Sequence, residues 1–235
     1  MKIRGRRRCK DCGREWSYYE TGDVACPDCG SVESVGVDDE RTLHTDAPVE
    51  LDLTGVRSEV DRRPLRDVAA DAGEVARSYF LSRGFVDAGE LRSLDGVVVA
   101  AAELRHAAGA LGRALVASED EERYFLALLA GADDGERPEE VPESMRSARG
   151  FGTADVVEAY RSDLSAWLNE HPDPAAEELL GRVRDHAKRI RALDGEVTPG
   201  EADRLLSATR ELGTYLRDGE ETALARARER LERLG

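Results

Sequence analysis

Four cysteines, arranged as two Cys-x-x-Cys pairs, are the residues whose type and spacing point most directly to chemistry. They are Cys9, Cys12, Cys26 and Cys29, and the chain has no other cysteine. A two-residue gap lets two thiolates bind one ion, and a glycine after each pair lets the backbone turn its amides toward the sulfurs. We therefore predict one structural Zn²⁺ bound by all four sulfurs. Iron is the alternative metal. Two disulfides are less favoured, because bridges within or between such close pairs stabilise a fold poorly.

The charge composition is strongly acidic and poor in lysine. Asp and Glu total 49 against 34 Lys and Arg, which gives a formal net charge of −15 at pH 7. Only Lys2, Lys10 and Lys188 are lysine. Such a chain looks like a protein of an extreme halophile, because at molar salt the Debye length is about 3 Å and hydrated carboxylates keep a protein dispersed. An acidic mesophilic protein is the alternative. The acidic surface therefore says little about partners.

Residues 1–15 form a basic arm with a net charge of +5, from seven cations and two carboxylates. Guanidinium groups bind phosphates bidentately and aromatic rings stack on bases, so this composition favours nucleic-acid binding. The candidate nucleic-acid-binding residues are Arg4, Arg6, Arg7, Arg8, Lys10, Arg14, Trp16 and Tyr18. Two alternatives stay open. The cations would offset the charge of about −2 on a zinc–tetrathiolate centre, and the aromatic residues would form the core of a small module.

The cysteine pairs, with Gly13, Pro27 and Gly30, resemble the zinc-ribbon superfamily, in particular the transcription factor B type with its rubredoxin-like knuckles. The resemblance covers residues 1–40 and implies a small β fold around the metal. An aromatic-rich segment over 15–20 and a valine-containing segment over 31–37 predict two of its strands. The whole chain also looks like a group of haloarchaeal proteins that begin with this ribbon and continue into a helical region. That likeness implies no particular activity.

Residues 41–60 are predicted to form an extended linker, and residues 61–235 a helical domain. From residue 61 onward, apolar residues recur with the 3,4 spacing of buried helix faces. Glycines and prolines over 131–152 predict a flexible loop. Helix starts are predicted at Asp87, Ser118, Thr153, Pro174 and Thr198. The predicted fold is a small β zinc ribbon followed by a mainly α helical bundle of about seven helices.

Glu103 and His106 form the one catalytic-looking motif outside the cysteines. Glu-x-x-His beside a four-cysteine module resembles rubrerythrin, whose di-iron bundle needs that motif on each of two helices. This chain has one copy. At about 100° per residue, both side chains fall away from the apolar face of their helix, which predicts that both are exposed. The sequence contains neither a phosphate-binding glycine loop nor a Gly-x-Ser-x-Gly nucleophile elbow, so we expect no enzymatic activity.

The longest apolar run, residues 96–102, is too short to span a membrane, and no signal peptide follows the basic N-terminus. We therefore expect a cytoplasmic protein without a membrane partner. The favoured function is non-enzymatic: the arm and the ribbon contact nucleic acid or the transcription or translation machinery. The alternative is a protein-interaction adaptor, whose helical domain binds a protein partner while the zinc site is purely structural.

Overall fold

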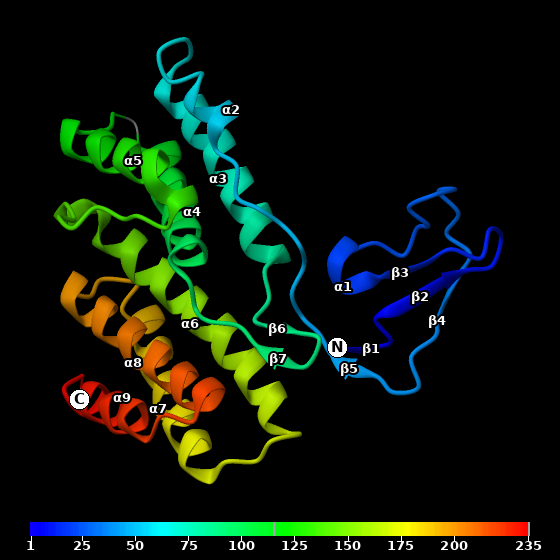
Figure 1. Cartoon of the computed structure of the whole chain (residues 1–235). Coiled ribbons are helices and arrows are strands. Elements are labelled where there is room, and N and C mark those ends of the chain that lie inside the picture. Colours follow the sequence, from blue (N-terminus) through cyan, green and yellow to red (C-terminus); the bar gives the residue numbers. More distant parts are fainter. Residues whose placement is uncertain (115, 235) are drawn as a thin grey trace.

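The computed structural model describes residues 1–114 and 116–234. Leu115, which the apolar pattern assigns to a helix face, lies outside the described residues, as does Gly235. A small N-terminal module, residues 1–43, lies beside a larger group of helices (Figure 1). Its elements are β1 (Lys2–Ile3), β2 (Arg6–Cys9), β3 (Glu15–Ser17), α1 (Tyr18–Thr21), β4 (Ser34–Gly36) and β5 (Thr42–Leu43).

The central sheet of the module is antiparallel, with β2 between β3 and β4. Arg7 in β2 lies opposite both Trp16 and Gly36. The strand predicted over 15–20 ends at Ser17. It ends there because the chain makes a single helical turn that closes at Gly22, whose φ of 65° is in the left-handed region open to glycine.

Residues 41–60, predicted as an extended linker, pack against both parts of the molecule. β5 pairs with β1, and α2 (Thr54–Arg57) forms a short turn. Leu51 and Leu53 are 7% and 0% exposed and belong to the core of the helical domain. The guanidinium of Arg57 binds the carboxylate of Asp133 with two contacts of 2.6 Å. The buried leucines and the Arg57–Asp133 ion pair therefore anchor this polar segment to the helical domain.

The helical domain has one continuous hydrophobic core. Its two central helices are α4, which packs on α3, α5 and α6, and α6, which also packs on α7 and α8 (Figure 1). α9 covers α8. Among the described residues, no helix is both long and apolar enough to cross a bilayer. The elements are α3 (Leu65–Ser82), β6 (Val86–Asp87), β7 (Glu90–Leu91), α4 (Gly96–Arg113), α5 (Glu119–Gly131), η1 (Ala132–Asp134), η2 (Glu143–Met145), α6 (Arg146–Leu168), α7 (Pro174–Ala192), α8 (Pro199–Asp218) and α9 (Glu221–Glu232).

Three of the predicted helix starts are confirmed. Ser118 and Thr198 each form a reciprocal capping box with the glutamate three residues later. Pro174 occupies the first turn of α7, capped by the side chain of Asp173.

The start predicted at Asp87 is wrong. Residues 86–91 form the hairpin of β6 and β7, with Ala88 and Gly89 at φ 50° and 89°, and α4 begins after Asp95, whose carboxylate accepts from the Val98 amide. An Asp-x-Gly-Glu stretch fits both a capping box and a two-residue hairpin turn.

The start predicted at Thr153 and the end of the predicted flexible loop are also wrong, because α6 already begins at Arg146. Its two glycines allow close helix packing. A Cβ at Gly150 would lie 2.1 Å from the Gly195 carbonyl oxygen, and one at Gly152 would lie 2.8 Å from the Glu103 Cα. Glycine here serves close approach between backbones rather than flexibility.

Candidate metal centre

The four cysteine sulfurs converge on one point of the N-terminal module. All four lie within 4.8 Å of one another, and the Cys9–Cys29 and Cys12–Cys26 sulfur pairs are each 3.6 Å apart. Zn–S bonds of about 2.3 Å in a tetrahedron place sulfurs about 3.8 Å apart, whereas a disulfide requires about 2.05 Å. The cysteines are free thiols in this arrangement. The geometry fits one tetrahedral metal ion and excludes the disulfide alternative for this structure.

Each knuckle is a tight turn closed by its glycine. The Gly13 amide donates to the Cys9 carbonyl at 3.2 Å, and the Gly30 amide donates to the Cys26 carbonyl at 2.8 Å. Both glycines have left-handed backbones, with φ of 78° and 71°. A side chain at either position would strain the turn, so the glycines noted in the sequence are required by the backbone conformation.

The electrostatics of the four thiols fit a site that is completed by a cation. The Cys12 amide lowers the pKa of Cys9 to about 7. The Ser31 amide also acts to lower the pKa of Cys29, but the neighbouring Cys12 thiol and burial outweigh it and raise that pKa to about 12. Neighbouring thiolates repel one another, so deprotonation of further thiols in the cluster is unfavourable. A bound divalent cation would offset this repulsion.

Trp16 belongs to the interior of the module. With Cys9 and Cys26 it forms a separate small core, and its indole N–H donates to the Asp23 carbonyl at 3.2 Å. Its ring is therefore not free to stack on a base. Tyr18 packs edge-on against the buried His44 ring with centroids 5.9 Å apart. His44 itself lies outside the cysteine cluster.

The alternation of β2 divides the basic arm between two faces. Arg6 and Arg8 lie on one face, and both bind Glu15, at 3.0 and 2.6 Å. Arg7 lies on the other face, where its guanidinium donates to the Ser34 hydroxyl. Two more candidates also have acidic partners: Lys10 lies 3.6 Å from Glu33, and Arg14 lies 3.8 Å from Asp28. Four of the predicted phosphate-binding cations are thus paired within the module.

A small basic cavity opens on the Arg7 side of the module. It has a volume of about 280 Å³ and is lined by Lys2, Ile3, Arg4, Arg7, Gly36 and Arg41. Four of these six residues are cations, and none is acidic. Arg4 and Arg41 are exposed, and neither has an ion-pair partner among the described residues. We refer to this group as the basic cavity. Arg41 was not predicted, because no sequence signal links it to an arm that ends at residue 15.

Glu103 is buried in the helical domain, which contradicts the prediction that it is exposed. It is 1% exposed and lies against the guanidinium of Arg149, itself 3% exposed. Arg137 and the hydroxyl of Tyr124 also donate to its carboxylate. Because α4 is covered on several sides, its residues 98–104 are all buried, so a single apolar face does not describe it.

His106 is half-buried rather than freely exposed, again contrary to prediction. Its Nε2 lies 2.8 Å from the Asp155 carboxylate, and its ring stacks on Phe151. Within the described residues, the four cysteines are the one group of three or more His, Cys, Asp or Glu side chains placed to hold an ion. Glu103 and His106 are therefore parts of two separate ion-pair networks, and nothing here forms a di-iron site.

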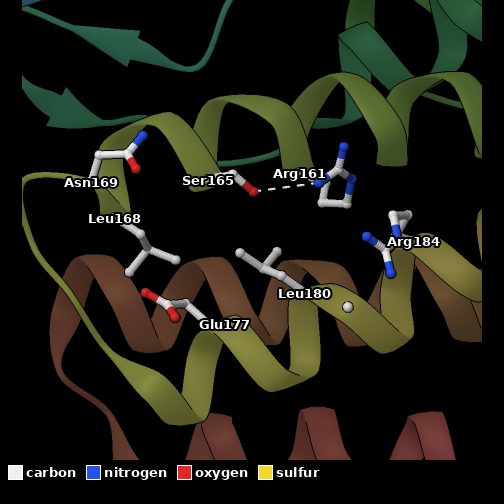
Figure 2. A pocket seen from close by; sticks show the side chains of 8 residues that line it. Arg161, Ser165, Leu168, Asn169, Glu177, Leu180 and Arg184 are labelled. Atoms are coloured by element: carbon white, nitrogen blue, oxygen red, sulfur yellow. Dashed lines mark hydrogen bonds between the residues drawn. The ribbon is translucent and has the colours of Figure 1, made fainter.

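A groove lies between α6 and α7. It has a volume of about 350 Å³, and the Arg161 guanidinium in it donates to the Ser165 hydroxyl at 3.4 Å (Figure 2). Arg161 is neutralised by Glu158, and Leu168 and Leu180 face each other across the groove. The lining contains no histidine or cysteine. Its two cations, Arg161 and Arg184, each contact a carboxylate, so the groove offers no unpaired cationic site.

Comparison with known proteins was informative at the family level only. No curated protein and no solved structure gave a significant match. A family model did match, over residues 1–231 and therefore over both the cysteine module and the helices. The chain belongs to the family of unknown function DUF7117.

Proposed function

We propose that this chain is a non-enzymatic, cytoplasmic zinc-ribbon protein that binds the phosphates of nucleic acid through the basic cavity of its N-terminal module. The observation that carries the proposal is the charge of that cavity. Lys2, Arg4, Arg7 and Arg41 line it; Lys2 pairs with Glu170 at 3.0 Å, whereas Arg4 and Arg41 make no ion pair among the described residues. An arginine guanidinium can bind a phosphate with two parallel hydrogen bonds. Such close contacts are less weakened by salt than long-range electrostatic attraction is.

The proposed metal role is structural. Four sulfurs complete a tetrahedral zinc shell, so no position is left open for substrate. Zinc is preferred over iron because electron transfer needs a second redox centre, and Glu103 and His106 are held in other networks. Four free thiols fit a reducing compartment, which supports the cytoplasmic assignment. The acidic, lysine-poor composition supports function at high salt.

The two faces of β2 provide a matched test of this proposal. The test variant carries Arg4→Ser and Arg41→Ser, which removes two unpaired cations of the basic cavity. The control variant carries Arg6→Ser and Arg8→Ser, which removes the same charge from two residues that both pair with the carboxylate of Glu15. Fluorescence anisotropy would measure binding of each protein to labelled single-stranded RNA and DNA over a series of potassium chloride concentrations, with bound zinc measured in parallel.

We expect the test variant to lose affinity by at least about tenfold and its salt slope to fall by about 1.4, at about 0.7 per phosphate contact on a single strand. The control variant should bind nearly as tightly as the wild type. Equal loss in both variants would mean that net charge alone drives binding. Binding by neither the wild type nor the variants to either nucleic acid would reject the proposal.

A protein-interaction adaptor is the second candidate, and one observation favours it. Val24, Val32 and Val35 are 43%, 71% and 41% exposed on the module. All three lie next to Ser34, which contacts the Val24 and Val32 carbonyls. Exposed apolar residues on neighbouring backbone segments of a small module favour a protein contact. Pull-down with the wild type and with Val32→Asp would test it: a partner that is lost in the variant while zinc is retained would support the adaptor role.

A further inference from the structure

A second cationic cavity lies in the helical domain, away from the cysteine module. Its volume is about 370 Å³, within the range of small-molecule sites. Three arginines line it, from three different segments: Arg137 from the loop after η1, Arg149 from α6 and Arg210 from α8. The rest of its lining is Gly96, Gly135, Pro138, Glu139 and Asp203.

Two of the three arginines are held and neutralised by two carboxylates. Glu103 accepts from both Arg137 and Arg149, at distances of 2.9 to 3.1 Å. Asp203 bridges the same two guanidinium groups, at 2.9 and 3.5 Å. Arg149 also donates to the Pro138 carbonyl at 2.6 Å. This network of hydrogen bonds and ion pairs fixes both guanidinium planes, and the two carboxylates leave Arg137 and Arg149 close to electrically neutral.

Arg210 is held differently from the other two arginines of the cavity. Its side chain donates only to main-chain oxygens, those of Leu94 at 2.9 Å and Asp95 at 3.4 Å. No ion pair involves it among the described residues. Burial, followed by the charge of Arg137, lowers the pKa of Arg210 despite the opposing effects of Asp95 and Asp203. Among the described residues, Arg210 is therefore a guanidinium beside another arginine without a carboxylate contact of its own, and the unpaired Glu139 in the lining balances its charge without touching it.

The first turn of α4 adds to the positive potential. Gly96, the first residue of this 18-residue helix, lines the cavity, and the helix dipole places partial positive charge at that end. A Cβ at Gly96 would lie 2.7 Å from the Gly135 carbonyl oxygen, so the absence of a side chain at Gly96 allows the loop to approach the end of the helix. Glu139 is exposed at the rim, and it makes no ion pair among the described residues.

We propose that this cavity binds the phosphate group of a small molecule, with Arg210 as the principal anion-binding residue and Arg137 as its neighbour in the contact. Arg210 has no carboxylate on its guanidinium in the described part of the chain, and guanidinium N–H donors match phosphate oxygens in geometry. The volume exceeds what a phosphate group occupies, so the cavity has room for a small phosphate monoester as well as for inorganic phosphate. This proposal is independent of nucleic-acid binding by the N-terminal module.

Isothermal titration calorimetry on the full-length protein would test the proposal, with inorganic phosphate and glycerol 3-phosphate as the two probes at constant potassium chloride. We expect saturable binding of at least one probe, with a Kd of about 1 mM or below. Arg210→Gln should raise that Kd at least about tenfold. Arg184→Gln is the matched control, because Arg184 is an exposed arginine that lines the groove between α6 and α7 and contacts its neighbour Asp185.

A second variant keeps the test decisive if Arg210→Gln is poorly folded. Glu139→Gln removes an exposed negative charge from the rim and should tighten binding by about two- to fivefold, as expected for one partly screened charge. Tighter binding of glycerol 3-phosphate than of inorganic phosphate would assign the site to a phosphate monoester. Absence of saturable binding by both probes, or the same Kd in the wild type, Arg210→Gln and Glu139→Gln, would overturn the proposal.

Discussion

Glu103→Gln should destabilise the protein by about 3–5 kcal/mol, because it removes the negative charge that neutralises a buried arginine. Arg149 is 3% exposed and would retain only Asp203, at 3.5 Å, as a charged partner. Glutamine keeps the size of the side chain, so the loss reports on charge rather than on a cavity. At about 2–4 °C per kcal/mol for a chain of this size, Tm should fall by roughly 6–20 °C.

The assay is thermal and urea denaturation followed by circular dichroism in molar potassium chloride. Glu119→Gln is the control, because Glu119 has 90% side-chain exposure and pairs with Arg123 at the surface. Exposed pairs contribute little, so the Tm of this control should stay close to that of the wild type. Replacing both partners, as Glu103→Leu with Arg149→Met, should recover much of the stability lost by Glu103→Gln, because no unpaired charge then remains between the two positions.

An equal Tm for Glu103→Gln and Glu119→Gln would refute this prediction. That result would mean that water solvates Arg149 or that a rearranged carboxylate neutralises it, and that the ion-pair network does not contribute to the stability of the helical core.

Three further predictions follow from the same contacts. Cys26→Ser should abolish binding of about one zinc per chain and unfold the module, since metal binding supplies its folding free energy, while the helical circular dichroism remains; elemental analysis that finds iron in the wild type would contradict this. Asp155 should stabilise the protein by about 2 kcal/mol above about pH 5. Burial raises its pKa, but hydrogen bonds from His106 and Arg191 outweigh burial and lower it from 3.8 to about 2. The contribution is therefore lost as pH falls toward 2, and the stability difference from Asp155→Asn should shrink between pH 5 and pH 3; a constant difference would refute it. Finally, a fragment that lacks residues 1–60 should have a lower urea midpoint than one that lacks residues 1–45, because it also loses the buried Leu51 and Leu53; equal midpoints would show that residues 46–60 do not stabilise the helices.

The candidate metal-binding cysteines and several helix starts could be predicted from the sequence because their interactions are local. Cys9 and Cys12, like Cys26 and Cys29, are separated by two residues, so the turn that brings each pair together is encoded where the ligands are. Capping boxes involve residues three apart, which explains the success at Ser118 and Thr198. The same local rule failed at Asp87, where a hairpin turn satisfies the same residues.

Burial and pairing depend on elements from elsewhere in the chain, and only the tertiary structure decided them. Glu103 was predicted to be exposed because its own helix has an apolar face elsewhere, yet α6 brings Arg149 to it across 46 residues. Arg41 joins the basic cavity because β5 pairs with β1, a contact that no local pattern encodes. A sequence states which side chains carry charge. Which of those charges meet a partner, and which remain available to a ligand, depends on how distant segments pack.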